Sequence, residues 1–210
     1  MSTMEDELRT LWLELCDRLS AKHLLQAHGA TLSLRLPGVD AMWFGEVGTP
    51  TPRRVDFDAT GAAAWHADIY VQRGDVGAIA IGGGAFGHRL AQFGGRMPEV
   101  FDEQARHLGR MEPALMHREE LFDALAAGGN VVLAEGEPVC MGMTGTRMAL
   151  NAELFEKCAK AYVLAVAAGG SVKPLPWLVR FIANRRLMKD EQNAKASWAR
   201  GCLPQESGGY

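Results

Sequence analysis

The sequence predicts an α/β domain, because helical and strand periodicities alternate along it. Residues 4–26 place apolar side chains at helical spacing, and residues 31–36 then alternate between apolar and polar. Residues 76–81 form a short continuous apolar run, which is typical of a strand buried on both faces. Helical spacing returns over residues 147–168. Periodicity alone allows either a parallel or an antiparallel sheet.

The remaining elements follow from turn residues and apolar runs. Pro37-Gly38 predicts a turn, and residues 41–44 return as a second strand. Residues 45–59 and 94–112 hold several prolines, glycines and charges, so we expect them to be loop-rich and irregular. The other expected elements are helices over 61–73, 85–92, 117–127 and 177–198 and strands over 130–134 and 138–143.

Length and composition exclude several classes of protein. The 210 residues contain no internal repeat or linker, so we expect one domain over residues 1–175. Residues 176–210 form a C-terminal helix and tail, packed on that domain or on a neighbouring subunit. A net charge of −3 gives no basic surface for nucleic acid, and no apolar run is long enough to span a membrane. The four scattered cysteines indicate free thiols, and we expect a cytoplasmic protein.

Three consecutive glycines, Gly82 to Gly84, end the apolar run at residue 81. Glycines allow positive φ angles and close backbone approach, which active-site loops often need. Residues 82–87 also match the dinucleotide pattern GxGxxG. Pro98 stands where the second parallel strand of such a unit should be, so a nucleotide-dependent oxidoreductase is the least favoured function.

Three blocks in order resemble the class II aldolase/adducin family. Residues 28–36 (HGATLSLRL) are similar to its strand "SGN-x-S-x-R", and residues 66–80 (HADIYVQRGDVGAIA) to "H-x-x-I/A-Y-x-x-R-P-D-V-x-A-V-V". Residues 131–170 resemble the block that begins with "L-L-x-N-H-G" and ends in a long helix with two glycines. The resemblance covers residues 5 to 175. It implies a three-layer α/β/α fold with a central, mostly antiparallel sheet, and a homotetramer or other homo-oligomer with sites between subunits.

The same resemblance implies a zinc site whose ligands are missing from this chain. The family binds zinc through "H-x-H" and "N-H-G", and these histidines fall at Ile81, Gly83 and Glu135. The family's catalytic glutamate falls near Ala62, and the substrate-binding asparagine at Thr31. We therefore expect no zinc and no other cofactor. The alternatives are a metal site rebuilt from His88, Glu135 and His107, or an emptied site whose backbone amides bind an anion.

Four residues are candidates for moving protons. His88 lies one turn past the glycines, and His107 lies in a polar stretch that either faces a substrate or is simply solvated. Glu135, between an apolar run and Gly136, is either a partly buried carboxyl group with a raised pKa or an ordinary loop residue. His66 either makes a structural hydrogen bond or faces the cleft near Ala62.

The substrate-binding candidates surround the same strand end. Arg106 and Arg110 are suited to holding an anion. The other candidates are Thr31, Ser33, Gly82, Gly83 and Gly84.

Two functions remain in view. The first is a diverged lyase that cleaves or decarboxylates a hydroxy- or oxo-substituted small molecule without zinc. The second is a non-catalytic, adducin-like oligomeric scaffold or ligand-binding protein. A lyase needs titratable groups that converge in a cleft shielded from water, whereas a scaffold does not.

Overall fold

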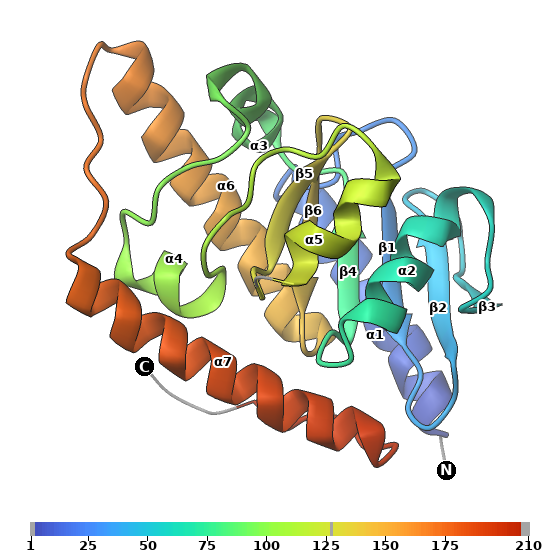
Figure 1. Ribbon diagram of the computed structural model, residues 1–210. Coiled ribbons are helices and arrows are strands. Elements are labelled where there is room, and N and C mark those ends of the chain that lie inside the picture. The colour runs from blue at the N-terminus through green and yellow to red at the C-terminus, as the bar shows by residue number, and fades with distance from the viewer. Residues whose placement is uncertain (1–2, 127, 207–210) are drawn as a thin grey trace.

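The computed structural model describes residues 3–126 and 128–206, and these residues contain one six-stranded sheet. The strand order is β3-β2-β1-β4-β6-β5, and every pairing between neighbours is antiparallel. The expected antiparallel α/β/α architecture is therefore confirmed (Figure 1). The strands are β1 (Thr31–Arg35), β2 (Ala41–Glu46), β3 (Arg53–Asp56), β4 (Ala78–Ile81), β5 (Val131–Ala134) and β6 (Glu137–Gly142).

Helices cover both faces of this sheet. In Figure 1, α2 and α5 lie in front of the strands, and α1 and α6 lie behind them. The helices are α1 (Met4–Ala21), α2 (Ala64–Gln72), α3 (Ala85–Arg89), α4 (Asp102–His107), α5 (Leu121–Ala126), α6 (Gly145–Ala167) and α7 (Trp177–Ala199). Short 3₁₀ segments are η1 (Gly61–Ala63), η2 (Leu90–Phe93) and η3 (Arg118–Glu120).

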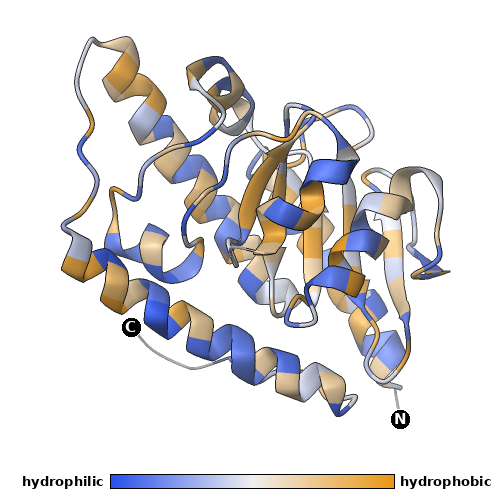
Figure 2. Ribbon diagram, viewed as in Figure 1, coloured by the Kyte–Doolittle hydropathy of each residue, from blue (hydrophilic) through white to orange (hydrophobic). Residues whose placement is uncertain are grey.

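Alternation along the strands divides the core into two clusters. In β1, Leu32 and Leu34 pack in the cluster with α1 and α6, and Ser33 between them points to α2. In β4, Ala78 and Ala80 join the same first cluster, whereas Ile79 packs with α2 and α5. A strand buried on both faces has no polar side, which explains the continuous apolar run over residues 76–81. Figure 2 shows the central strands as the most hydrophobic part of the ribbon.

Three expected elements differ from the structure. Residues 53–56 form the edge strand β3, where the loop was expected, because its arginines and aspartate suit an exposed sheet edge and hide the strand signal. Residues 102–107 form α4, which is too short to show a helical period. The first helix ends at Ala21 and not at residue 26. His23 there adopts a φ of 57°, and the Leu24 N–H donates to Leu19 O at 2.9 Å.

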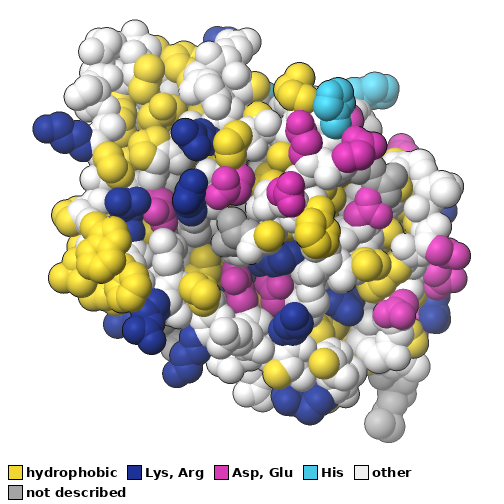
Figure 3. Space-filling view, in the orientation of Figure 1, with side chains coloured by type: hydrophobic (Ala, Val, Ile, Leu, Met, Phe, Trp, Pro, Cys, Tyr) yellow, Lys and Arg dark blue, Asp and Glu magenta, His cyan; other side chains and the backbone are white. Residues whose placement is uncertain are grey.

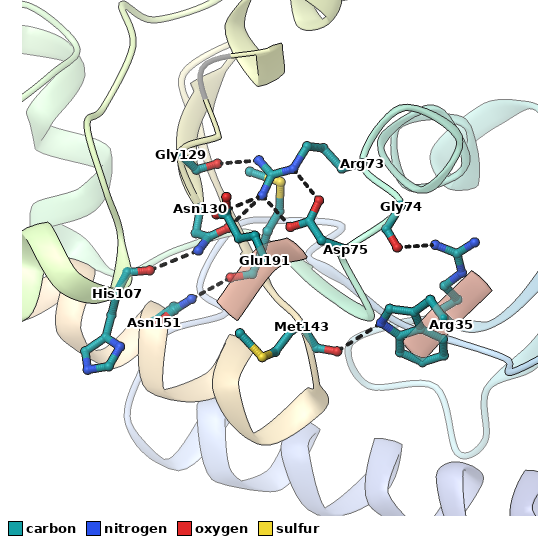
Figure 4. A network of polar contacts seen from close by, with 12 residues as sticks. Arg35, Arg73, Gly74, Asp75, His107, Gly129, Asn130, Met143, Asn151 and Glu191 are labelled. Carbon is teal, nitrogen blue, oxygen red and sulfur yellow. Dashed lines mark hydrogen bonds and ion pairs between the residues drawn. The ribbon is translucent and has the colours of Figure 1, made fainter. Parts of the chain in front are cut away.

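The C-terminal helix α7 packs along α4 at the lower edge of the molecule in Figure 1. Trp198 Nε1 donates to Met143 O at 3.3 Å, and Arg106 of α4 pairs with Asp190 of α7. Arg73 makes a third link, because its Nη2 lies 3.2 Å from Glu191 Oε1 and 2.7 Å from Asp75 Oδ2 (Figure 4). These contacts hold α7 on the domain of its own chain. None of the described helices is long and apolar enough to cross a membrane.

Candidate functional site

The triple glycine forms a tight turn after β4. Gly82 and Gly83 adopt φ angles of 142° and 53°, a region that favours glycine. The Gly82 N–H donates to Pro138 O at 3.1 Å, and Gly83 O accepts from the Gln26 N–H at 3.2 Å. The turn is therefore fixed between β6 and the loop that follows α1.

Side chains of the same chain fill the space around this turn. A Cβ atom on Gly82 would lie 2.7 Å from Ala30 Cβ, and one on Gly83 only 2.3 Å from Pro138 Cγ. A Cβ on Gly84 would lie 2.6 Å from Glu156 Cδ. Such distances are well below van der Waals contact. Close packing therefore explains the glycines without a substrate bound over them.

An anion does lie against backbone amides here, and the protein supplies it. Glu156 Oε1 accepts from the Phe86 N–H at 2.7 Å, and Oε2 accepts from the Gly87 N–H at 2.9 Å. Lys22, Lys157 and Lys160 line a shallow cavity of about 470 Å³ beside this carboxylate. We expected the amides of Gly82 to Gly84 to bind an external anion; the amides that bind a carboxylate are instead those of Phe86 and Gly87, two and three positions after Gly84, and the carboxylate is that of Glu156.

Zinc ligands are absent from the aligned strand end. Ile81 and Gly83 carry no donor atom, and Pro138 takes the room that a side chain at Gly83 would need. Over residues 3–126 and 128–206, no group of three or more His, Cys, Asp or Glu side chains is arranged to hold a metal ion. Among the described residues, His88, Glu135 and His107 therefore do not come together as a metal site.

His66 is a fully buried histidine of α2 with both ring nitrogens hydrogen-bonded. Nε2 lies 2.8 Å from Thr31 Oγ1, and Nδ1 lies 2.7 Å from Ser33 Oγ. Ser33 Oγ also lies 2.7 Å from the Tyr70 hydroxyl, one helical turn after His66. Burial lowers the pKa of His66 to about 3, so the ring is neutral at physiological pH. These contacts favour the structural role for His66, Thr31 and Ser33 over contact with a substrate.

Glu135 and His88 do not meet. Glu135 and Gly136 adopt φ angles of 52° and 86° in the two-residue turn between β5 and β6, and Glu135 is exposed. Of the two interpretations of Glu135, the partly buried carboxyl group is therefore wrong and the ordinary loop residue fits, because this hairpin turn leaves Glu135 exposed. His88 is half-buried, and its Nδ1 lies 3.5 Å from Oε2 of Glu137 instead.

Arg106 and His107 line one cavity, of about 700 Å³, between α4 and α7. Arg147 Nη1 lies 3.0 Å from His107 Nδ1 and, because a guanidinium can only donate, the imidazole accepts through Nδ1. The neutral ring then carries its proton on Nε2. Burial, helped by Arg147 and Arg106, lowers the pKa of His107 to about 4. The imidazole at this cavity is therefore a neutral hydrogen-bond donor at pH 7.

The rest of this cavity is polar at one side and apolar at the other. Arg186 and Lys189 add cations to its wall, and Val179, Ile182 and Ala183 form an apolar strip along α7. Asp190, which is paired with Arg106, also lines it. Arg110 lies elsewhere, in a second cavity, with its Nε 3.4 Å from Glu112 Oε1. Of the predicted residues, only Arg106 and His107 share a cavity among those found on the described residues.

Sequence reasoning missed two residues that shape these places. Glu156 lies three positions after Glu153 in the long predicted helix, and two carboxylates at this spacing on one helical face could have marked Glu156 as a candidate. Arg147, 40 residues after His107, gave no local signal, because only the fold brings the two together.

Comparisons with known proteins find similarity in structure and not in sequence. No family model matches the chain, and no curated protein matches it. YgbL from Escherichia coli superposes with a TM-score of 0.73 at 17% identity, covering 87% of this chain and 100% of its own. An L-fuculose 1-phosphate aldolase gives a TM-score of 0.73 at 18% identity, covering 90% of this chain and 98% of its own. An aldolase II superfamily protein from Pseudomonas syringae gives 0.71 at 15% identity, covering 95% and 92%.

The TM-scores establish the fold and, at identities this low, the fold alone; the coverage shows that the likeness extends over nearly the whole of both chains. The chain therefore has the fold that L-fuculose 1-phosphate aldolase shares with the aldolase II superfamily protein.

Proposed function

We propose that this chain uses the class II aldolase fold without a zinc ion, as an oligomeric ligand-binding protein. The observation that carries the proposal is the closed turn at the end of β4. Pro138 fills the space beside Gly83, and Glu156 fills the space beside Gly84. Of the two aligned ligand positions at this strand end, Gly83 cannot present a side chain to a metal without displacing Pro138, and Ile81 carries no donor atom.

The distribution of titratable groups supports the same proposal. His66 is buried in the core, Glu135 points into solvent, and His88 is placed beside Glu137. An enzyme that moves protons needs such groups within hydrogen-bond reach of one substrate. A ligand-binding protein needs only a cavity with a few placed polar groups, and the cavity between α4 and α7 provides one.

The first experiment measures the metal content of freshly purified, tag-free protein by plasma mass spectrometry. We expect no stoichiometric zinc, iron or manganese, and no change in melting temperature on adding EDTA or zinc chloride. We also expect no cleavage of L-fuculose 1-phosphate, the substrate class that the name of one structural neighbour gives. Stoichiometric metal together with EDTA-sensitive cleavage would overturn the proposal.

A second candidate function, a metal-independent lyase, is favoured by the state of His107. A 3-oxo acid that decarboxylates loses its carboxylate as CO₂, and the electron pair of the broken C–C bond moves to the carbonyl oxygen as an enolate. His107 is neutral with its proton on Nε2, so it can donate a hydrogen bond to that oxygen, while Arg186 and Lys189 bind the acid. Solvent then protonates the enolate carbon.

Release of CO₂ from oxaloacetate and acetoacetate separates the two functions. The lyase predicts turnover above the buffer rate that falls at least about 100-fold in His107→Phe, the size of effect seen when one oxyanion donor is removed. His117→Phe is the matched control, because His117 is exposed and does not line this cavity. Equal rates for the protein and for buffer support the ligand-binding proposal.

Two exposed apolar faces of opposite charge support a homo-oligomer. Trp177 and Phe181 of α7 stack at 5.1 Å between their ring centroids, and Arg185 lies over the Phe181 ring. The other face, over α2 and α5, exposes Val71, Met116 and Phe122 among the acidic residues Glu119, Glu120 and Asp123. Figures 2 and 3 show the apolar start of α7 and the lysines and arginines around it. Two different faces that complement each other form head-to-tail contacts between copies of one chain, and these contacts close into a ring when the rotation between neighbours divides a full turn.

Light scattering coupled to gel filtration tests this assembly. We expect a mass of several chains for the wild type and a smaller one for Phe181→Asp, with Val39→Asp, an exposed apolar residue away from both faces, as control. A monomeric wild type contradicts the assembly. We also propose a cytoplasmic location, which the four unpaired cysteines support.

A further inference from the structure

A cavity of about 530 Å³ has a wall rich in arginine. It lies between the segment after η2, the segment after α4, the second half of α6 and the start of α7. Arg96, Arg110 and Arg180 line it from three separate segments, and Glu99 is its one carboxylate. It shares no lining residue with the cavity of Arg106 and His107.

Glu99 is held in place but incompletely satisfied. Its side chain is only 5% exposed, its Oε2 lies 3.6 Å from Arg180 Nη1, and its Oε1 has no hydrogen-bond partner within the protein. Glu99 O accepts from the Leu175 N–H at 2.8 Å, which fixes the segment between α6 and α7 over the site. A buried carboxylate oxygen without a donor is unfavourable, because it has lost its hydration and gained no hydrogen bond in exchange. A donor from a bound molecule would remove that cost.

The arginines leave positive charge at the mouth. Arg180 is committed to Glu99 and, through Nε, to Leu175 O at 3.0 Å, and Arg110 pairs with Glu112. Arg96 is exposed, and within the described part of the chain no ion pair or hydrogen bond to its guanidinium is found. Figure 3 shows lysine and arginine side chains gathered on this side of the molecule. One guanidinium is therefore available to a ligand.

The other walls are apolar. Phe93, Met97 and Met111 line the cavity together with Pro98 and Pro174, and Tyr162 of α6 adds a ring with a hydroxyl group. Three arginines and one carboxylate beside these apolar side chains, in a volume of this size, suit a small molecule that has both a charged and an apolar part. Methionine side chains adapt to the shape of what they contact.

We propose that this cavity binds a small carboxylate with an apolar body and a hydroxyl or amino group on the carbon next to the acid. Arg96, supported by Arg110, binds the carboxylate of the ligand. The hydroxyl or amino group of the ligand donates to the unsatisfied carboxylate of Glu99. The apolar body lies against the methionines and Phe93. This site is independent of the proposed function, since it uses neither the β4 turn nor the cavity of His107.

Isothermal titration calorimetry on the full-length protein tests the proposal with four probes. They are 3-phenyllactate, phenylalanine, 3-phenylpropionate, which lacks the donor, and inorganic phosphate, which lacks the apolar body. We expect 3-phenyllactate or phenylalanine to bind with a dissociation constant below about 1 mM. We expect 3-phenylpropionate to bind about five- to tenfold more weakly, because it leaves Glu99 without its donor.

Variants assign the binding to the named residues. Arg96→Gln should weaken binding about tenfold or more, whereas Arg89→Gln, an exposed arginine outside the cavity, should not. Glu99→Met, which removes both acceptor oxygens, should abolish the preference for 3-phenyllactate over 3-phenylpropionate. If that variant does not fold, Arg96→Lys keeps the charge but loses the planar fork, and should weaken binding as well. No binding by any organic probe, tightest binding by phosphate, or equal binding by Arg96→Gln and wild type overturns the proposal.

Discussion

Replacing Gly83 with alanine tests whether Pro138 really closes the end of β4. Gly83 has a φ of 53°, and an added Cβ would lie 2.3 Å from Pro138 Cγ and 2.8 Å from its Cβ. Gly136 is a matched control, since it has a φ of 86° but nothing within 4 Å of an added Cβ. Both substitutions pay about 1–2 kcal/mol for an alanine in the left-handed region. Only Gly83→Ala also overpacks its surroundings, at about 1–3 kcal/mol.

The difference between the two variants isolates the contact with Pro138. Urea unfolding should give Gly83→Ala a free energy of unfolding about 1–3 kcal/mol below that of Gly136→Ala. For a chain of this length, that corresponds to about 2–4 °C in melting temperature for each kcal/mol. Alanine also lowers the conformational entropy of the unfolded chain relative to glycine, and this stabilising effect is the same at both positions, so it cancels in the comparison.

A double-mutant cycle then identifies the neighbour. Pro138→Gly removes the ring, so adding Gly83→Ala to that background should cost no more than Gly136→Ala does. Equal free energies for the two single variants would refute the reasoning. In that case the space beside Gly83 is open, and a side chain could stand there as it does in the family pattern.

Three further predictions concern other contacts. Glu156→Ala should lower the free energy of unfolding by about 2–4 kcal/mol, because the Phe86 and Gly87 amides lose a charged acceptor. Glu153→Ala is the control and should cost under about 1 kcal/mol, because its partners are the surface cations Arg18 and Lys22. Equal losses for the two variants in urea unfolding contradict this prediction. Burial raises the pKa of Glu191 to about 7 despite Arg73 (Figure 4), so the stability that Glu191 contributes is full below its unfolded pKa of 4.5 and is lost as pH rises through 7. Between pH 5 and 8 the free energy of unfolding should therefore fall by about 1–3 kcal/mol more in the wild type than in Glu191→Gln. Parallel pH profiles for the two proteins speak against this prediction. Arg147→Met removes one cation beside His107, so an NMR titration should show the pKa of His107 rising from about 4, although burial keeps it below 6.5; an unchanged value rules out the contact with Nδ1.

The sequence predicted the layers well because they depend on periodicity. A helix that covers a sheet repeats its apolar residues at helical spacing, and a doubly covered strand is apolar throughout, so α1, α6 and β4 were visible in the chain itself. The edge strand β3 and the six-residue helix α4 were not, because a charged edge and a single helical turn carry no such pattern. The antiparallel order came from the family resemblance and is confirmed by the pairing.

In the candidate site, too, some features could be predicted from the sequence and others only from the fold. The sequence by itself determined that Ile81 and Gly83 bring no donor atoms to the strand end, since side-chain chemistry is a property of the residue alone. Only the tertiary structure decided what fills that place. Pro138 and Glu156 reach the glycine turn from 55 and 72 residues further along the chain, and Arg147 meets His107 across 40. The same is true of His66, which a sequence cannot distinguish from an exposed base until Thr31 and Ser33 are seen to enclose it. Contacts between distant segments are fixed by how helices pack on the sheet, and local sequence carries no record of them.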